Sequence, residues 1–384
     1  PNPRQREFLA CEKKYVAFGG ARGGGKSWAV RTKAKLLALR YPGIRLLLVR
    51  RTYQELEANH IRFLLRELAN LAEYRATARQ FAFPDGSVLD FGYCAADGDM
   101  DRYQGAEYDV IFLDEATQLV LHALHLPHDL GPAYGQARLT AEEKHTILAL
   151  FQRRIDERVP AAYLTGEAWF AGLNFKSDRR ALVPRSPIAE LIESGFEPWL
   201  GGREVRRALD LCTGSGCIAI AMGHYNPDWQ VDGADISDDA LALAAENKAR
   251  LHADNVDLVK SDLFAGLGGR HYQLIVTNPP YVTDDETDAL PREYSYEPEL
   301  GLRAGPDGLD LVLKILRDAP LHLSQDGLLI CEVGESERHL VKLLPELDLA
   351  WIEFKVGQMG IFAVECHDLI THNARIAELA AARG

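Results

Sequence analysis

Thr277-Asn278-Pro279-Pro280-Tyr281 directly follows the apolar run Leu274-Ile275-Val276. The run predicts a buried strand. The prolines predict where it ends, because proline cannot donate to a sheet ladder and restricts the residue before it. Asn278, Pro279 and Tyr281 should then lie at the carboxyl edge of a sheet, where ligands bind in open α/β folds. The alternative is a strand that ends in a proline turn and has no role in binding.

The chemistry of this edge suits a ligand that carries an NH₂ group. The side-chain oxygen of Asn278 and the carbonyl of Pro279 can accept the two N–H donors of such a group, while the Tyr281 ring covers its flat face. We therefore predict that Asn278, Pro279 and Tyr281 form the catalytic part of a site.

Strands and helices alternate regularly after Gly201-Gly202. Each of the first two strands is followed by a segment with the pattern of a helix, and Ser237 is placed to cap the second of these helices. The alternation predicts an α/β fold with a parallel sheet that is covered on both faces. The predicted strands are residues 206–211, 230–235, 256–261, 273–277 and 328–333.

Ligand-binding residue types stand at the ends of these strands. Two glycines in the first turn let the backbone approach a ligand, Asp210 can accept from an ammonium group, and Asp235 can reach ribose hydroxyls. Asp262 can hold an adenine amine. The same features fit a dinucleotide site, although Ala219 stands where that motif usually has its third glycine. Asp235 and Asp262 could also be solvated strand ends. The predicted cofactor-binding residues are Asp210, Thr213, Gly214, Gly216, Asp235, Asp262 and Asn278.

Together these motifs resemble class I S-adenosylmethionine-dependent methyltransferases. More narrowly, residues from about 114 to 384 resemble the bacterial N(5)-glutamine methyltransferases of ribosomal protein L-three and of release factors. Release-factor enzymes usually carry Pro-Glu-Thr-Glu after a proline-arginine pair. This chain has Ser186-Pro187-Ile188-Ala189 there, which favours the ribosomal-protein branch. The segments that carry the resemblance are residues 182–187, 210–216, 278–281, 297–302 and 332–334.

This resemblance implies a fold and an activity. The fold is a seven-stranded, Rossmann-like sheet over residues 196–384, preceded by a small helical and hairpin substrate-recognition domain over residues 119–195. The implied activity is N(5)-methylation of a glutamine side-chain amide in a protein, with S-adenosylmethionine as cofactor. Ribosomal protein L-three is the expected partner, and a release factor is the less favoured one.

A phosphate-binding motif of the form G-x-x-x-x-G-K-[ST] occupies residues 20–27. An apolar strand is expected before it at residues 15–18, and a helix after it at residues 28–39, which is the context in which this motif is informative. Its glycines would wrap phosphates, Lys26 would neutralise their charge, and Ser27 would hold Mg²⁺.

Residues 1–118 resemble the ATPase domain of phage terminase large subunits, as a partial P-loop α/β fragment. An apolar strand at residues 109–113 leads into Asp114 and Glu115, which suit metal coordination and water activation. The later strands of that family are missing here, so we predict a vestigial site without ATP turnover, in a chain that is a fusion or chimera. The residues implied to bind ATP and Mg²⁺ are Gln5, Arg22, Gly25, Lys26, Ser27, Asp114 and Glu115.

The balance of acidic and basic residues differs between the two parts of the chain and limits the kinds of partner that each can bind. Residues 1–118 hold 18 Lys and Arg against 15 Asp and Glu, whereas residues 119–384 hold 25 against 41. This change predicts modules of different origin and argues against a large DNA surface on the second one. No apolar run is long enough to predict a membrane span. Six cysteines without a Cys-x-x-Cys pair predict reduced thiols in the cytoplasm, and the missing initiator methionine predicts a fragment or a processed chain.

Two constellations imitate metal sites. The aspartates of residues 97–101 match the start of a calcium loop but lack its later glycine and glutamate. The histidines of residues 122–128 are spaced three apart, but Pro127 would interrupt a helix face that aligned them. We predict that neither binds a metal.

Two other functions compete with the glutamine methyltransferase. A DNA adenine-amine methyltransferase would use the same acceptors, but it needs a flipped base and a basic target-recognition region. A phage packaging ATPase, or a chimera in which only nucleotide binding survives, predicts ATP-dependent DNA binding and no methyl transfer.

Overall fold

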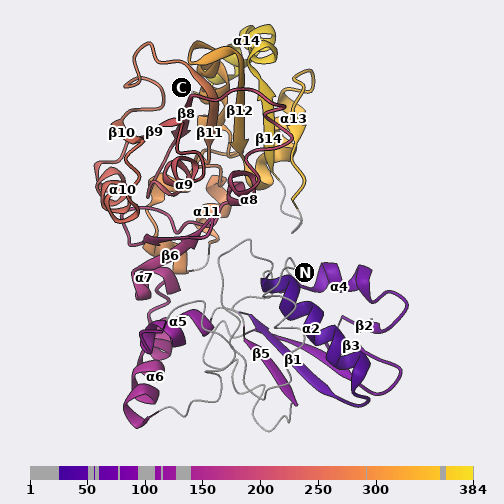
Figure 1. Cartoon of the computed structure of the whole chain (residues 1–384). Coiled ribbons are helices and arrows are strands. Elements are labelled where there is room, and N and C mark those ends of the chain that lie inside the picture. Colours follow the sequence, from indigo (N-terminus) through magenta and orange to yellow (C-terminus); the bar gives the residue numbers. More distant parts are fainter. Residues whose placement is uncertain are drawn as a thin grey trace. The chain divides into compact units, whose positions relative to one another are not determined.

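The computed structural model describes residues 26–50, 56, 60–76, 78–93, 109–113, 116–126, 140–290, 292–354 and 360–383. The chain divides into two compact units, residues 1–165 and residues 166–384 (Figure 1). In the described part, no helix has the length and apolar character needed to cross a membrane.

The first unit contains a five-stranded sheet with the order β2-β3-β4-β1-β5. Its central strand β1 pairs in parallel with both β4 and β5. One apolar cluster joins Ala34 and Ala38 of helix α2 to Leu46 and Leu48 of β1, so the helix packs on the sheet. The elements are α2 (Lys26–Arg40), β1 (Arg45–Arg50), α4 (Arg62–Glu67), β2 (Glu73–Arg75), β3 (Gln80–Ala82), β4 (Val88–Tyr93) and β5 (Val110–Leu113).

Three helices complete this unit: α5 (Ala116–Ala123), α6 (Ala141–Asp156) and α7 (Ala161–Thr165). A capping box closes the first turn of α6. The Thr140 hydroxyl accepts from the Glu143 N–H at 3.2 Å, and the Glu143 carboxylate accepts from the Thr140 N–H at 2.7 Å.

The second unit begins with the hairpin β6 (Glu167–Phe170) and β7 (Leu173–Lys176). A buried side chain, Asn247, fixes the end of this hairpin. Its Oδ1 accepts from the Lys176 N–H at 2.7 Å, and its Nδ2 donates to the Ser215 carbonyl at 3.0 Å. The hairpin is thereby tied to the glycine-rich turn that follows the first strand of the main sheet.

The predicted seven-stranded sheet is confirmed, with the order β10-β9-β8-β11-β12-β14-β13. Strands β8 to β12 pair in parallel, but β14 runs antiparallel to both of its neighbours, so the prediction of a wholly parallel sheet is wrong there. The connection over residues 352–360 is shorter than the dozen or so residues that a parallel crossover needs. The strands are β8 (Arg207–Leu211), β9 (Gln230–Asp235), β10 (Val256–Lys260), β11 (Tyr272–Thr277), β12 (Leu323–Glu332), β13 (Ala350–Trp351) and β14 (Ile361–Glu365).

Alternate residues along these strands enter two separate cores, so both faces of the sheet are covered. Ala208 and Leu274 pack in the core that includes helices α8 and α9, whereas Leu209 and Ile275 pack in the core that includes α12 and α14. The helices are α8 (Ile188–Glu193), α9 (Cys217–Tyr225), α10 (Asp238–Leu251), α11 (Asp284–Asp288), α12 (Asp310–Asp318), α13 (Glu337–Leu343) and α14 (Cys366–Ala381). Short 3₁₀ turns are η4 (Arg292–Tyr296), η5 (Glu299–Gly301), η6 (Ala319–Leu321) and η7 (Gly334–Ser336).

The strand order reverses at β8, which has β9 on one side and β11 on the other. Such a switch point leaves a crevice at the carboxyl ends of the strands, where α/β sheets bind ligands. The topology therefore predicts the site beside β8 and β11.

Candidate active site

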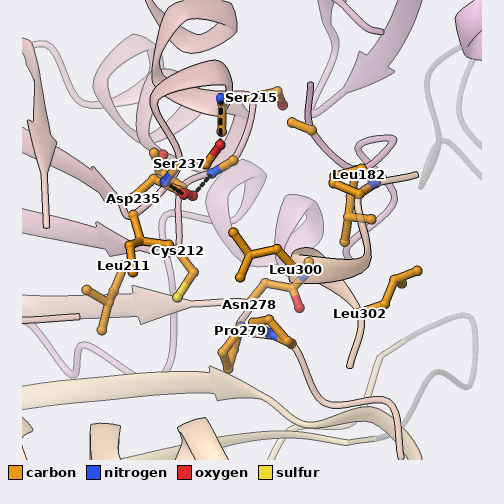
Figure 2. A pocket seen from close by; sticks show the side chains of 18 of the residues that line it. Leu182, Leu211, Cys212, Ser215, Asp235, Ser237, Asn278, Pro279, Leu300 and Leu302 are labelled. Carbon is orange, nitrogen blue, oxygen red and sulfur yellow. Dashed lines mark hydrogen bonds between the residues drawn. The ribbon is translucent and has the colours of Figure 1, made fainter. Parts of the chain in front are cut away.

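A cavity of about 410 Å³ lies at the carboxyl ends of β8, β9, β10 and β11 (Figure 2). This volume lies within the range of small-molecule sites. The cavity is lined by the three predicted catalytic residues and by every predicted cofactor residue except Asp210 and Gly216. The structure thus brings together residues that are far apart in the sequence.

The turn between β8 and α9 is built around two glycines. Gly214 and Gly216 have φ values of +55° and +79°, in the left-handed region that favours glycine. A Cβ at Gly216 would lie 3.0 Å from the Cβ of Ala244, so this glycine also allows the turn to pack on α10. Gly214 forms part of the cavity wall, and Gly216 supports that wall from behind.

Asp210 lies behind this turn. Its side chain is fully buried, and its Oδ2 accepts from the Thr213 hydroxyl at 2.5 Å and from the Ala219 N–H at 2.9 Å. Burial raises the pKa of the Asp210 carboxyl to about 7. Its Oδ1 has no hydrogen-bond partner among the described residues. Asp210 therefore fixes the turn, and direct contact with an ammonium group stays a prediction.

Asp235 holds the neighbouring strand end in place. Its Oδ2 accepts from the Gly214 N–H and its Oδ1 from the Ser237 N–H, both at 2.8 Å; Figure 2 shows Asp235 beside Ser237. Burial raises the pKa of this carboxyl. Each oxygen keeps a lone pair that a hydroxyl could use. Asp262 follows β10, is exposed and lines the same cavity.

Asn278 and Pro279 follow β11 directly, and Figure 2 shows both among the residues that line the cavity. Asn278 is half-buried and Pro279 is buried. Among the residues that the structure describes, no donor is hydrogen-bonded to the Asn278 side-chain oxygen or to the Pro279 carbonyl. Two cavity-lining residues thus offer acceptors without a hydrogen bond from the described residues, and their role in binding an NH₂ group stays a prediction.

Tyr281 is held by a residue to which the sequence analysis gave no role. Its hydroxyl donates to Glu332 Oε1 at 2.9 Å, and the Ser186 hydroxyl donates to Glu332 Oε2 at 2.5 Å. Burial, with the Glu332 carboxylate beside it, raises the pKa of Tyr281 well above its ordinary value. Glu332 and Ser186 also line the cavity. Two sequence signals pointed to Glu332: it ends a strand, and it begins the segment of residues 332–334 noted for its family resemblance.

An ion pair with a buried carboxylate was also not predicted. Arg185 binds Glu297 through two N–O contacts of 2.8 and 2.9 Å, and its guanidinium lies 4.8 Å from the centre of the Tyr294 ring. The Val183 N–H donates to the same carboxylate at 3.3 Å. The pair joins two segments, residues 182–187 and 297–302, that the sequence analysis had noted only for their family resemblance.

Four cysteines in the second unit are free thiols: Cys212, Cys217, Cys331 and Cys366. Burial raises the pKa of the Cys217 thiol to about 12, so this cavity-lining side chain stays protonated and is a weak nucleophile. Within the described ranges, no group of His, Cys, Asp or Glu is arranged to hold a metal ion.

Most of the predicted nucleotide site lies outside the described residues. Gln5, Arg22, Gly25, Asp114 and Glu115 fall there. Lys26 and Ser27 form the start of helix α2, and the acidic pair falls between β5 and α5. The P-loop fragment therefore stays a prediction.

Two families match different parts of this chain. A methyltransferase small-domain family matches residues 198–292. The N-terminal family of T4likevirus-type terminase large subunits matches residues 17–121. The two matches do not overlap, and they support the predicted fusion of two modules.

Relatives over the larger part of the chain are close. A ribosomal protein uL3 glutamine methyltransferase of Xanthomonas campestris pv. campestris is 85% identical over 279 residues, which are 73% of this chain and 90% of that protein. One of Xylella fastidiosa is 78% identical over 279 residues and is covered to 89%. Among solved structures, a methyltransferase from Pyrococcus furiosus is 21% identical, with 51% of this chain and 89% of that chain covered and a TM-score of 0.37.

An identity of 85% across nine tenths of a relative leaves little room for a different family. The cavity, the glycine turn and the Asn278-Pro279 acceptors all lie in the second unit, where the methyltransferase small-domain family matches. The chain therefore belongs to the family of ribosomal protein uL3 glutamine methyltransferases.

Proposed function

We propose that this chain transfers a methyl group from S-adenosylmethionine to the side-chain amide nitrogen of a glutamine in ribosomal protein uL3. The observation that carries the proposal is the pair of open acceptors at Asn278 and Pro279, in the same cavity as the predicted cofactor residues. The names of the relatives reported above support uL3 as the substrate. A release factor is the less favoured candidate.

The residues around the first turn fit S-adenosylmethionine. Asp235 and Asp262 offer carboxylate oxygens to hydroxyl and amine groups, and the backbone at Gly214 has only Ala181 near the position of a Cβ, at 3.9 Å. The absence of a side chain there allows a ligand to approach the turn. When bound, S-adenosylmethionine supplies a methyl group activated by its sulfonium centre.

Asn278 and Pro279 would orient the substrate amide. A glutamine amide is a poor nucleophile because its nitrogen lone pair is delocalised into the carbonyl. If both N–H groups are held by fixed acceptors, the nitrogen faces the methyl group in one orientation, and orientation is a large part of catalysis. The same oxygens stabilise the positive charge that develops on the nitrogen. The Tyr281 ring covers the amide and limits its contact with water.

These acceptors also provide selectivity. A glutamate side chain has no N–H donors, so its entry would leave the Asn278 oxygen and the Pro279 carbonyl unpaired. Each unpaired buried acceptor costs about 1–3 kcal/mol. We expect a glutamate in the target position to be rejected.

The direct test is methyl transfer to purified substrates. The chain is incubated with labelled S-adenosylmethionine and either uL3 or a release factor, and the modified residue is mapped by mass spectrometry. We expect one methyl group on one glutamine side chain of uL3, and none on a uL3 variant in which that glutamine is glutamate. Methylation of another residue type, or none, would refute the proposal.

We further propose that DNA is not the target of the methyltransferase. Residues 119–384 hold 25 Lys and Arg against 41 Asp and Glu, and such an acidic module is a poor match for phosphate backbones. A ribosomal-protein substrate favours the cytoplasm as the compartment. DNA oligonucleotides that contain adenine serve as the test, because they should accept no label.

We propose for residues 1–118 a nucleotide-binding fragment by descent, without turnover of ATP. The similarity of residues 17–121 to terminase N-terminal regions favours this origin. We expect no ATP hydrolysis that depends on Lys26. Hydrolysis by the intact chain that disappears in Lys26→Ala would contradict this part of the proposal.

A further inference from the structure

We propose that Glu332 is a positioning residue for methyl transfer, which acts by holding the Tyr281 ring against the amide subsite of Asn278 and Pro279. This inference rests on the proposed function of that subsite. Glu332 does not itself touch the reacting atoms in this account; it acts through Tyr281.

The sheet places Glu332 next to the amide subsite. Strands β11 and β12 pair in parallel with Thr277 opposite Cys331, so the chain leaves β11 at Asn278 where β12 ends at Glu332. The carboxylate is 6% exposed and lines the cavity. Its Oε1 accepts from the Tyr281 hydroxyl at 2.9 Å. The tip of the Tyr281 side chain is therefore tied to the neighbouring strand.

The rest of Tyr281 fits closely against glycine backbone. A Cβ at Gly334 would lie 2.5 Å from Cε2 of the Tyr281 ring, and a Cβ at Gly308 would lie 2.2 Å from the Tyr281 carbonyl oxygen. The Ser336 hydroxyl donates to that carbonyl at 3.1 Å. The Tyr281 backbone and one edge of its ring are thus confined by glycine backbone. The hydrogen bond from the hydroxyl to Glu332 fixes the tip of the ring in addition.

The second oxygen of Glu332 links a second wall of the cavity. Its Oε2 accepts from the Ser186 hydroxyl at 2.5 Å, and the Ser186 oxygen in turn accepts from the Ile188 N–H at 3.1 Å. Ser186 belongs to the segment of residues 182–186 that lines the cavity. One carboxylate therefore sets the position of Tyr281 and of this segment together.

A carboxylate suits this position because the hydroxyls of Tyr281 and Ser186 both donate to it. A glutamine in its place has one oxygen and one NH₂ group, so it can accept from only one of the two hydroxyls in the present arrangement. The Tyr281 phenol stays protonated, since burial and the adjacent carboxylate raise its pKa. Glu332→Gln thus keeps the volume and breaks one tether.

The test measures kcat, KM for uL3 and the Kd of S-adenosylmethionine for Glu332→Gln, Tyr281→Phe and the double variant. A displacement of about 1 Å at a reacting group costs on the order of 100-fold. We expect each single variant to lower kcat about 10- to 100-fold, with both binding constants within about twofold of wild type. The double variant should lose little more than the worse single variant, because Tyr281→Phe already removes the contact through which Glu332 acts.

A matched control is Glu335→Gln, the same substitution at an exposed position three residues further along. We expect its kcat to equal that of wild type. If Glu332→Gln does not fold, Tyr281→Phe carries the test, since it removes only the tethered hydroxyl.

Three results would overturn the inference: unchanged kcat in either single variant, equal loss of kcat and cofactor affinity, or losses that multiply in the double variant. Failure of the wild-type chain to methylate uL3 is a different result, because it refutes the proposed function and this inference with it.

Discussion

Removal of Arg185 should destabilise the second unit, because it leaves the buried Glu297 carboxylate without its ion-pair partner. The Glu297 side chain is 2% exposed, and Arg185 binds it through both of its carboxylate oxygens. Without Arg185, the one described residue that still donates to this carboxylate is Val183, through its N–H at 3.3 Å. Loss of one partner of a buried ion pair costs about 3–5 kcal/mol. The Arg185 side chain is 31% exposed, so water can reach the vacated space, and we expect about 3 kcal/mol for Arg185→Met.

The double variant Arg185→Met/Glu297→Gln is the matched control. Because it removes both charges, we expect it to recover most of the lost free energy of unfolding, as replacement of buried pairs by neutral groups often does.

Urea denaturation followed by tryptophan fluorescence measures these differences. Four of the five tryptophans lie in the second unit, so the signal reports mainly on that unit. A loss below about 1 kcal/mol in Arg185→Met, typical of an exposed pair, would refute this reasoning. So would a double variant as unstable as the single one.

Three further results are expected. Because burial raises the pKa of Asp210 to about 7, the free energy of unfolding should fall as the pH rises from about 4 to about 7; Asp210→Asn should flatten this slope in denaturation series at different pH values. Gly334→Ala places a Cβ 2.5 Å from the Tyr281 ring at a φ of +50°, so we expect a loss of about 1–3 kcal/mol in stability and a lower kcat, measured on the same preparation. Thr140→Ala removes the capping box with Glu143 and should destabilise α6 by about 1 kcal/mol, seen as faster hydrogen exchange in its first turn.

The strands of the second unit were predictable because each is a short apolar run with clear ends. The prediction of 230–235 matches β9 residue for residue, and the carboxyl ends of β11 and β12 are predicted within one residue, although β12 begins at Leu323 rather than at residue 328. Strands β13 and β14 were not predicted. The first is only two residues long, and the direction of β14 depends on a short connection rather than on its own side chains.

The site was predictable where its residues follow strands in sequence, and not where they meet only in space. Asn278 could be identified because it directly follows an apolar strand. The partner of Tyr281 lies 51 residues away, and that of Arg185 lies 112 residues away, so no local pattern connects them. The sequence also could not tell that Asp210 lies behind the turn, because a strand end looks the same whether its side chain faces the cavity or the core.

The central claim is that Asn278 acts on the glutamine amide and not on the fold or on cofactor retention. The measurement that tests it most directly compares Asn278→Ala with wild type in two assays: kcat for uL3 methylation and the Kd of S-adenosylmethionine by calorimetry. We predict a fall in kcat of about 100-fold or more with a Kd within about twofold. Undiminished methyl transfer, or equal losses in kcat and cofactor affinity, would contradict the account.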